Sequence, residues 1–248
     1  GRSWTSRESM MFSADVAGVA DLIAGGPGFV AVGGAGAEME GPAAVWTSPD
    51  GVSWTRVPHD DAVFGDATMT AVTEGGPGLV AVGKTGSLGG QGAAAVWTSP
   101  DGVSWTRVPH DDAVFGDATM TAVTEGGPGL VAVGGTGWLP PEPEHGAAVW
   151  TSPDGLTWTR LPDDAFGRAA PLLKVVGVDG HLVAIDEGST PWYSPDGTTW
   201  IVIPHGGEIA AGAYDTLVTS DDTTVVAIGS IEIVEDWRGA VWNFTVPD

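Results

Sequence analysis

Several residue types and patterns are scarce or missing in this chain. Its 248 residues include no cysteine, only 2 tyrosines and only 9 lysines and arginines together. Without thiols the chain cannot form disulfides, thiolate metal sites or a cysteine nucleophile. No apolar run approaches the roughly 20 residues of a membrane-spanning helix, and the first residues lack a charged-then-apolar signal pattern. We therefore expect no membrane insertion, and we expect a monomer.

The scarcity of basic residues gives the chain a formal net charge of −23. Such a surface repels phosphate backbones and anionic headgroups, and it favours cations or basic partners. We therefore expect no nucleic-acid ligand. A simpler explanation of the acidity is that it keeps a glycine-rich β protein in solution.

The residues that are abundant favour many short strands joined by tight turns, because the chain has 39 glycines, 18 prolines and 12 tryptophans. Residues 43–83 and 94–134 are identical over 41 positions at an offset of 51. A third copy begins at Ala147, and a more diverged copy contains Trp192–Trp200. A repeat of this length is typical of solenoids and propellers.

Each repeat divides into four short strands separated by turn residues. In the second copy we expect strands near 70–73, 79–83, 94–98 and 104–108, with turns at Glu74–Gly78 and Ser99–Gly102. Such a four-stranded antiparallel meander cannot cover both of its faces. Radial stacking of similar sheets would supply the missing cover.

The tryptophans give the number of blades. Expected third strands carry five of them and expected fourth strands only four: Trp46, Trp97, Trp150, Trp192 and Trp242, then Trp54, Trp105, Trp158 and Trp200. The missing fourth-strand position matches Trp4, because Gly1–Thr5 resembles Gly51–Thr55. The sequence therefore predicts an all-β, five-bladed β-propeller of four-stranded antiparallel blades. The N-terminal strand would complete the C-terminal blade and close the ring.

We expect residues 1–248 to form this single propeller. Its repeat units would cover approximately 16–57, 70–108, 121–161, 173–203 and 214–246, the last completed by residues 1–6.

The turn between the third and fourth expected strands repeats the pattern Ser-Pro-Asp-Gly-x-x-Trp. It resembles the Asp-box, or BNR repeat, of sialidase-like propellers, in a shortened form in which glycine directly follows aspartate. Asx-type turn bonding and a covering indole account for every residue type in the motif, so we predict structural roles for them. These residues are Ser48, Asp50, Trp54, Ser99, Asp101, Trp105, Ser152, Asp154, Trp158, Ser194, Asp196 and Trp200. The resemblance implies that these hairpins lie on the rim, away from the ligand face.

Candidate binding residues lie in the connections between blades. The segment His59–Asp66 recurs at His110–Asp117, with a reduced form at Asp163–Gly167. Its acidic residues predict a repeated pocket for Ca²⁺, a polyol or a cationic group: Asp60, Asp61, Asp66, Asp111, Asp112 and Asp117. The alternative is that Asp60 or Asp61 caps a helical turn and Phe64 fills the space between blades. No complete EF-hand-type loop supports the metal hypothesis.

Links between the second and third strands differ in every copy. Trp138 lies in one of them, beside several acidic residues. An exposed indole there could stack on a sugar ring, or it could cover a neighbouring loop.

Catalytic signatures of the resembling families are not matched. A sialidase needs convergent arginines and a tyrosine nucleophile, whereas Arg56, Arg107 and Arg160 occupy one repeated position around the rim. A glycosidase needs carboxylates facing a common sugar. Four acidic residues near inner strands keep that hypothesis open: Asp15, Asp21, Asp179 and Asp215.

The sequence therefore favours a non-catalytic binding or scaffold propeller that presents repeated loops to a glycan, a polymer or a protein. A glycoside hydrolase with a central acidic pocket and a purely structural module remain alternatives. We expect the protein to be secreted or extracytoplasmic. No cofactor is expected apart from Ca²⁺ under the acidic-pocket hypothesis.

Overall fold

The computed structural model of the chain describes residues 17–36, 41–86, 92–137, 146–166, 169–203, 212–219, 224–233 and 236–245. These residues form four four-stranded sheets and one three-stranded sheet, and all neighbouring strands are antiparallel. The first two sheets are β1 (Ala17–Gly25), β2 (Gly28–Ala35), β3 (Ala43–Ser48), β4 (Thr55–Arg56), then β5 (Ala67–Gly75), β6 (Gly78–Thr85), β7 (Ala94–Ser99) and β8 (Thr106–Arg107).

The remaining sheets follow in chain order. The third is β9 (Ala118–Gly126), β10 (Gly129–Thr136), β11 (Gly146–Ser152) and β12 (Thr159–Arg160); the fourth is β13 (Leu172–Val178), β14 (His181–Asp186), β15 (Pro191–Ser194) and β16 (Ile201–Val202). The fifth is β17 (Gly212–Thr219), β18 (Thr224–Ile233) and β19 (Asp236–Thr245). Helical structure in the described residues is limited to α1 (Asp112–Phe115) and a 3₁₀ turn at Asp163–Phe166. None of it has the length and apolar character that crossing a bilayer requires.

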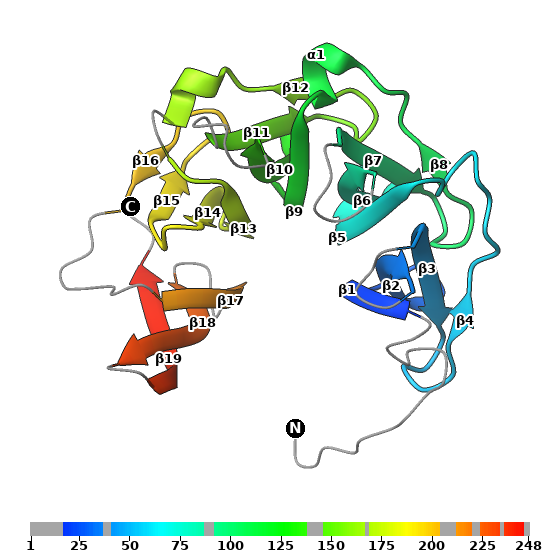
Figure 1. The fold of residues 1–248 in the computed structure, drawn as a ribbon, viewed down its shortest axis with the longest axis horizontal. Helices are drawn as coiled ribbons and strands as arrows, with labels where there is room; N and C mark the ends of the chain where they lie inside the picture. Colours follow the sequence, from blue (N-terminus) through cyan, green and yellow to red (C-terminus); the bar gives the residue numbers. More distant parts are fainter. Residues whose placement is uncertain are drawn as a thin grey trace.

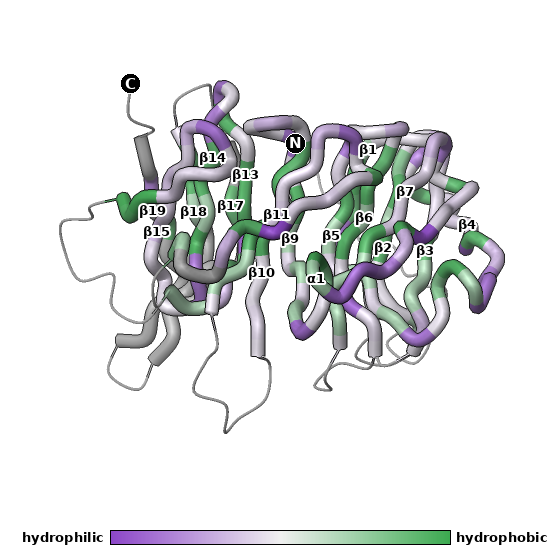
Figure 2. Tube along the Cα trace, turned by 90° about the horizontal axis from the view of Figure 1, so that it is seen from above, coloured by the Kyte–Doolittle hydropathy of each residue, from purple (hydrophilic) through white to green (hydrophobic). Residues whose placement is uncertain are grey.

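The sheets are arranged around a common axis, with β1, β5, β9, β13 and β17 innermost and the short fourth strands at the rim (Figure 1). Seen from the side, the sheets stand next to one another and their strands carry most of the hydrophobic residues (Figure 2). The expected N-terminal strand, residues 1–6, and Trp4 lie outside the described residues.

Four of the five hydrophobic clusters lie between two neighbouring sheets, and the fifth, with Ala31, Ala44 and Trp46, belongs to the first sheet alone. Because side chains alternate between the faces of a strand, the second strand of a sheet serves two cores. In β6, Leu79 and Ala81 join the core shared with the first sheet, whereas Val80 and Val82 join the core shared with the third. In β10 and β14 the residues divide in the same way. Burial on both faces explains why these strands are nearly uniform in hydrophobicity.

The strands differ in length from the expectation. In the second sheet the inner strand, expected at 70–73, extends over Ala67–Gly75, and the outer strand is reduced to Thr106–Arg107. Trp54, Trp105, Trp158 and Trp200 therefore precede the fourth strands and do not lie on them. The reason is local: each indole closes the preceding turn, as described below, and pairing with the third strand begins only after it.

Every innermost strand shifts register by one residue at the same point of the repeat, as a β-bulge does. The unpaired residues are Ala20, Thr70, Thr121, Leu173 and Asp215. The Thr70 hydroxyl donates to the Met120 carbonyl at 2.8 Å, and Thr121 donates to the Leu172 carbonyl at 2.7 Å. These bulges, which the sequence pattern did not indicate, therefore link each of two sheets to its successor.

Candidate functional site

The four Ser-Pro-Asp-Gly turns, here called the SPDG turns, have one hydrogen-bond pattern. They are Ser48–Gly51, Ser99–Gly102, Ser152–Gly155 and Ser194–Gly197. In the second turn, Asp101 Oδ1 accepts from the backbone N–H of Val103 at 2.8 Å and of Ser104 at 2.6 Å. The Gly102 N–H donates to the Ser99 hydroxyl at 2.8 Å, and Trp105 Nε1 donates to the Gly102 carbonyl at 3.0 Å.

These bonds favour the ionised form of each aspartate. Backbone N–H groups two and three residues further on lower the pKa values of Asp50, Asp101 and Asp154. Burial acts to raise the pKa of Asp196, but hydrogen bonds from Thr199 and Thr198 outweigh it and lower that pKa to about 2. Each carboxylate thus accepts hydrogen bonds from backbone N–H groups of its own turn.

The lowered pKa predicts an acid-sensitive contribution of Asp196 to stability. A carboxylate whose pKa falls on folding stabilises the protein above its unfolded pKa, near 3.8, and this contribution is lost as the pH drops towards about 2. We expect Asp196→Asn to have a lower Tm than the wild type at pH 6, with the difference shrinking between pH 4 and pH 2. Thermal melts by circular dichroism measure it. A difference that stayed constant from pH 6 to pH 2 would contradict the assignment.

The predicted acidic residues between sheets divide into caps and exposed carboxylates. Asp60 Oδ1 accepts from the Ala62 N–H at 2.9 Å, and Asp111 caps α1 by accepting from Ala113 at the same distance. The bond that the capping alternative predicts is therefore present at Asp60, and Asp111 forms the same bond in the next copy. Asp61 and Asp112 differ: each Oδ1 lies 2.8 or 2.7 Å from Nε2 of the histidine two residues earlier, which donates when that nitrogen is protonated, and their side chains are 96% and 97% exposed.

Asp66 and Asp117, at the ends of these loops, are exposed, and Asp117 has a positive φ of 49°. Trp138 lies outside the described residues, so its role in sugar stacking remains a prediction. Within the described ranges no group of three or more histidine, aspartate or glutamate side chains could hold a metal ion. The Ca²⁺ hypothesis stays a prediction.

A groove of about 680 Å³ lies where the first inter-sheet loop meets the SPDG hairpin of the second sheet, and we call it the rim groove. The loop side contributes His59, Asp60 and Asp61 over Val57, Pro58, Val63 and Phe64, and the hairpin side contributes Val103 and Trp105. Phe64 and Trp105 are only 3% and 7% exposed and form its floor, whereas Val103 is 46% exposed at its edge. The groove thus combines an apolar floor with carboxylates on one wall.

Only half of this groove could be predicted from the sequence. The pattern indicated Asp60 and Asp61, whereas the resemblance to Asp-box repeats implied that the hairpin with Val103 and Trp105 lies away from the ligand face. The loop reaches the hairpin because Phe64 enters the core between the first two sheets, in the same cluster as Trp105. Trp97 Nε1 holds the loop from below by donating to the Val63 carbonyl at 2.7 Å.

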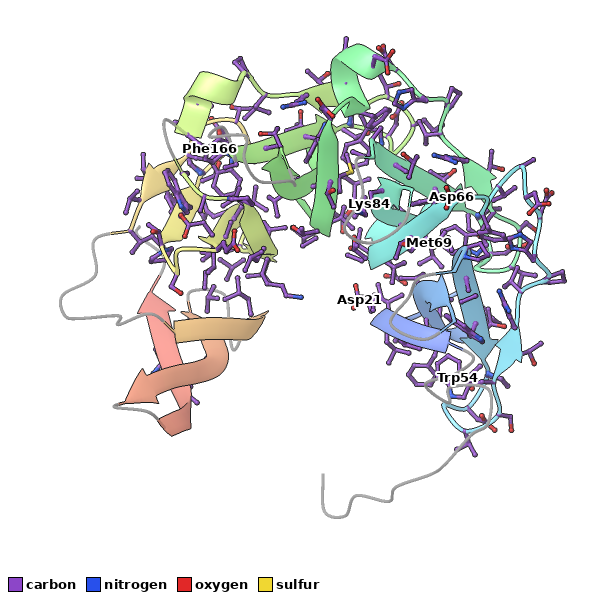
Figure 3. All side chains as sticks on the ribbon, viewed as in Figure 1. Asp21, Trp54, Asp66, Met69, Lys84 and Phe166 are labelled. Atoms are coloured by element: carbon purple, nitrogen blue, oxygen red, sulfur yellow. The ribbon has the colours of Figure 1, made fainter. Side chains whose placement is uncertain are left out.

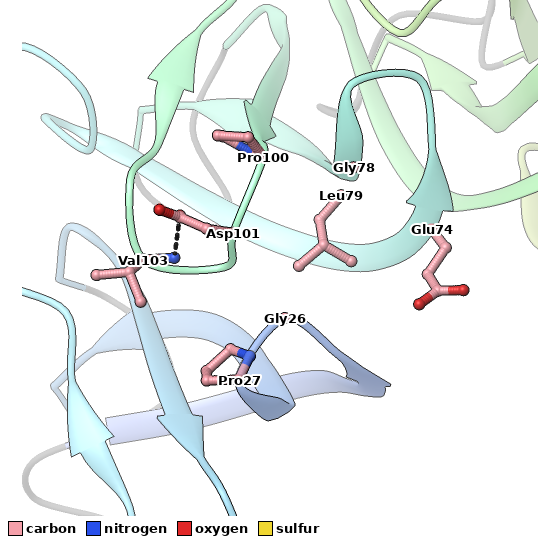
Figure 4. A pocket seen from close by; sticks show the side chains of 8 residues that line it. All are labelled: Gly26, Pro27, Glu74, Gly78, Leu79, Pro100, Asp101 and Val103. Carbon is pink, nitrogen blue, oxygen red and sulfur yellow. Dashed lines mark hydrogen bonds between the residues drawn. The ribbon is translucent and has the colours of Figure 1, made fainter.

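A second hollow of about 670 Å³ lies on the other side of Val103 (Figure 4). Gly26 and Pro27 from the β1–β2 turn border it, opposite Glu74 and the SPDG residues Pro100 and Asp101. Close packing explains the glycine: a Cβ on Gly26, whose φ is +56°, would lie 2.9 Å from the Asp101 carbonyl oxygen. Gly76 and Gly127 pack in the same way on the next two SPDG turns.

The repeated arginines do not converge. Arg107 lies over the Trp97 indole at 5.6 Å and Arg160 over Trp150 at 5.8 Å, each within its own sheet. Burial lowers the pKa of Arg107. Both guanidinium groups thus cover a core tryptophan.

Of the four carboxylates considered for glycoside hydrolysis, the structure describes the side chains of Asp21 and Asp179. Asp15 lies outside the described residues, and Asp179 lies in the exposed β13–β14 turn with a φ of 45°. Asp21 lies at the inner edge of β1 (Figure 3). Asp215 is the bulge residue of β17. Among the described side chains, Asp21 is the single carboxylate that lines the pocket at the axis.

Comparisons with known proteins identify the fold class. No protein-family model and no curated protein sequence matched the chain. Among solved structures, the chain is similar to YCF48 bound to a D1 peptide, with a TM-score of 0.53 and 15% identity over 92% of this chain and 69% of that one. It is also similar to a GH32 β-fructofuranosidase from Bombyx mori in complex with sucrose, with a TM-score of 0.50 and 12% identity.

The second alignment covers 92% of this chain but only 61% of the fructofuranosidase, so the chain spans less than two thirds of that protein. At these identities the likeness shows the fold alone. Together with four-stranded antiparallel sheets set around an axis, it places the chain among the β-propellers.

Proposed function

We propose that the chain is a closed five-bladed propeller of Asp-box repeats that binds a basic polypeptide in its rim grooves. Closure is supported by exposed apolar residues at the two ends of the described arc. On β1, Val19 and Leu22 are 43% and 51% exposed. The residues at the same repeat positions in the next sheet, Met69 and Val72, are 0% and 6% exposed because the preceding sheet covers them.

The last sheet has the complementary exposed residue. Val241 on β19 is 64% exposed, whereas its repeat equivalents Val45, Val96 and Val149 are at most 1% exposed against the following sheet. Val45 shares a core with Val72, the equivalent of Leu22. Bringing β19 against β1 would therefore bury Val241 with Leu22 and create a fifth interface like the other four. Exposed apolar surface of this kind normally finds cover.

The rim groove is the observation that supports binding. Its floor of Phe64 and Trp105 is fixed by core packing, and its wall has the freely exposed carboxylate of Asp61. Rigid, largely apolar grooves with a few placed polar groups are the usual form of recognition sites. A peptide with an apolar side chain for the floor and a lysine or arginine for Asp61 satisfies both features.

Charge and exposure favour a polypeptide over a glycan. The net charge of −23 attracts a basic chain. Sugar stacking needs an open aromatic face, and Trp105 offers only 7% of its surface. The solved structure of YCF48 with a D1 peptide supports peptide binding by a propeller of this general fold.

A second groove of the same chemistry is expected one repeat further on. His110–Phe115 has the same sequence as the loop that forms the first groove, and Leu156 and Trp158 replace Val103 and Trp105. Two weak sites on one rigid disc bind a long partner more tightly than either site alone. We therefore expect long basic chains to bind better than short ones.

The experiment compares fluorescent peptides with alternating lysine and leucine against peptides with alternating glutamate and leucine. We expect the basic peptide to bind, with affinity falling as salt rises. Asp61→Asn/Asp112→Asn should weaken binding about tenfold or more, since it removes charge from both grooves without touching a cap. Asp66→Asn/Asp117→Asn is the matched control, because it removes the same two charges from exposed positions at the ends of these loops, and Asp66 does not line the groove.

Val103→Asp should also weaken binding, because it places a charge at the apolar edge. Val52→Asp, in the corresponding position of the first SPDG turn, controls for effects on the turn itself. Equal binding of both peptides, or unchanged binding in the double variant, would sink the proposal and favour a purely structural module. Preferential binding on a glycan array would favour the lectin-like alternative.

Glycoside hydrolysis is the second candidate, supported by the position of Asp21 in the axial pocket. It requires a second carboxylate there at about 5–10 Å. Asp215 occupies the bulge position of β17. Hydrolysis of aryl glycosides that is lost in both Asp21→Asn and Asp215→Asn would establish this function.

A further inference from the structure

The axial pocket is a separate feature from the rim groove. It has a volume of about 140 Å³ and is lined by residues of all five innermost strands. Each strand contributes at or close to its bulge, including Ala20 and Asp21 from β1, Thr70 from β5, Thr121 from β9 and Lys174 from β13. Leu217 of β17 completes the lining.

Two side chains of opposite charge border this pocket at one repeat position. Asp21 and Lys174 each directly follow the bulge residue of their strand, where the identical second and third repeats have Ala71 and Ala122. The charged residues therefore stand on the first and fourth sheets, and small residues stand between them. The pocket therefore has a negative charge on one side and a positive charge on another, although the repeats around it are similar.

The Asp21 carboxylate is held in place and retains capacity to bind. Its Oδ2 accepts from the Val72 N–H at 2.9 Å and its Oδ1 from the Leu22 N–H at 2.8 Å. A carboxylate offers about four acceptor positions, so roughly two remain. Among the described residues, the Lys174 side chain has no hydrogen-bond or ion-pair partner, and in particular none in Asp21. The two charges thus face one cavity without neutralising each other.

We propose that the axial pocket binds a small zwitterion, whose ammonium group pairs with Asp21 and whose carboxylate pairs with Lys174. Water occupies about 30 Å³ per molecule in the liquid, so 140 Å³ holds about five non-hydrogen atoms. That is the size of a short amino acid such as glycine or β-alanine. Charge-assisted hydrogen bonds at both ends are the strong kind.

Selectivity follows from having both charges. A monovalent amine or carboxylate of the same size satisfies one side chain and leaves the other charge facing an occupied pocket, which is unfavourable. Glycerol has similar size and no charge. Zwitterions should therefore bind, and the single-charge and neutral compounds should bind at least tenfold more weakly.

Ligand-observed NMR with glycine and β-alanine, against propylamine, propionate and glycerol, tests the proposal. Lys174→Met should reduce zwitterion binding at least tenfold while keeping the stem that lines the pocket. Asp21→Asn should do the same, and its circular dichroism melt reports whether the fold is kept. Basic-peptide binding should be unchanged in Lys174→Met, so failure here is distinguishable from failure of the rim groove.

Asp215→Asn resolves which carboxylate takes part, because the strand register places Asp215 at the bulge of β17. Zwitterion binding should survive this change. Loss of binding in Asp215→Asn together with full binding in Asp21→Asn would overturn the assignment. So would equal binding of zwitterions and glycerol, or full binding in Lys174→Met.

Discussion

Leu22→Ala is expected to lower the free energy of unfolding by about 2–5 kcal/mol, the range for truncating a buried leucine. Such a loss would be unexpected for a side chain that is 51% exposed in the described arc. It follows from closure, because Leu22 then occupies the same environment as Val72, Val123 and Val175 in the other interfaces.

Two further leucines provide matched references in urea or guanidinium titrations. Leu172→Ala removes a side chain that is 0% exposed in an observed interface and should cost the same 2–5 kcal/mol. Leu156→Ala removes one that is 54% exposed on an SPDG turn, and its effect should stay within about 0.5 kcal/mol. If Leu22→Ala behaves like Leu156→Ala, the ring is open at that face.

Trp150→Ala is expected to cost about 3–5 kcal/mol, because the indole is 0% exposed. Trp150→Phe keeps most of the volume but removes the donor that holds the Val114 carbonyl at 2.7 Å. An unpaired buried acceptor costs about 1–3 kcal/mol. Since Val114 belongs to α1, the Phe variant should also loosen the loop that forms the second rim groove.

Hydrogen exchange separates these two effects of Trp150→Phe. Amides at 110–116 should exchange faster than in the wild type, while those of β10 should change only with global stability. Binding of the basic peptide should weaken in the same variant. If the amides of α1 were protected from exchange as well as in the wild type, the indole would not anchor this loop.

Much of the architecture could be predicted from the sequence because the repeat constrains it. Two copies identical over 41 residues must fold alike. The SPDG motif specifies its own turn, in which Asp101 bonds N–H groups only two and three residues away. Local bonding of this kind depends on few other residues, so short-range reasoning could find it.

Features that depend on neighbouring sheets were harder to predict. The rim groove pairs Asp61 with Val103, residues brought together only by the packing of Phe64 between sheets. Similarly, no short-range pattern marks Thr70 as a bulge, because the extra residue is defined by its partner strand. Asp60 was ambiguous in the sequence since the same carboxylate can cap a turn or face a ligand, and in the structure it accepts from the Ala62 N–H and also lines the rim groove.

The most direct test of the account joins the two faces that closure brings together. The chain has no cysteine, so Leu22→Cys/Val241→Cys introduces the only two thiols. Mild oxidation during refolding should then join them directly as a disulfide within one molecule, giving a faster-migrating monomer under non-reducing conditions that the Leu22→Cys variant alone does not give. Cross-links found only between molecules, or none at all, would contradict a ring of five blades.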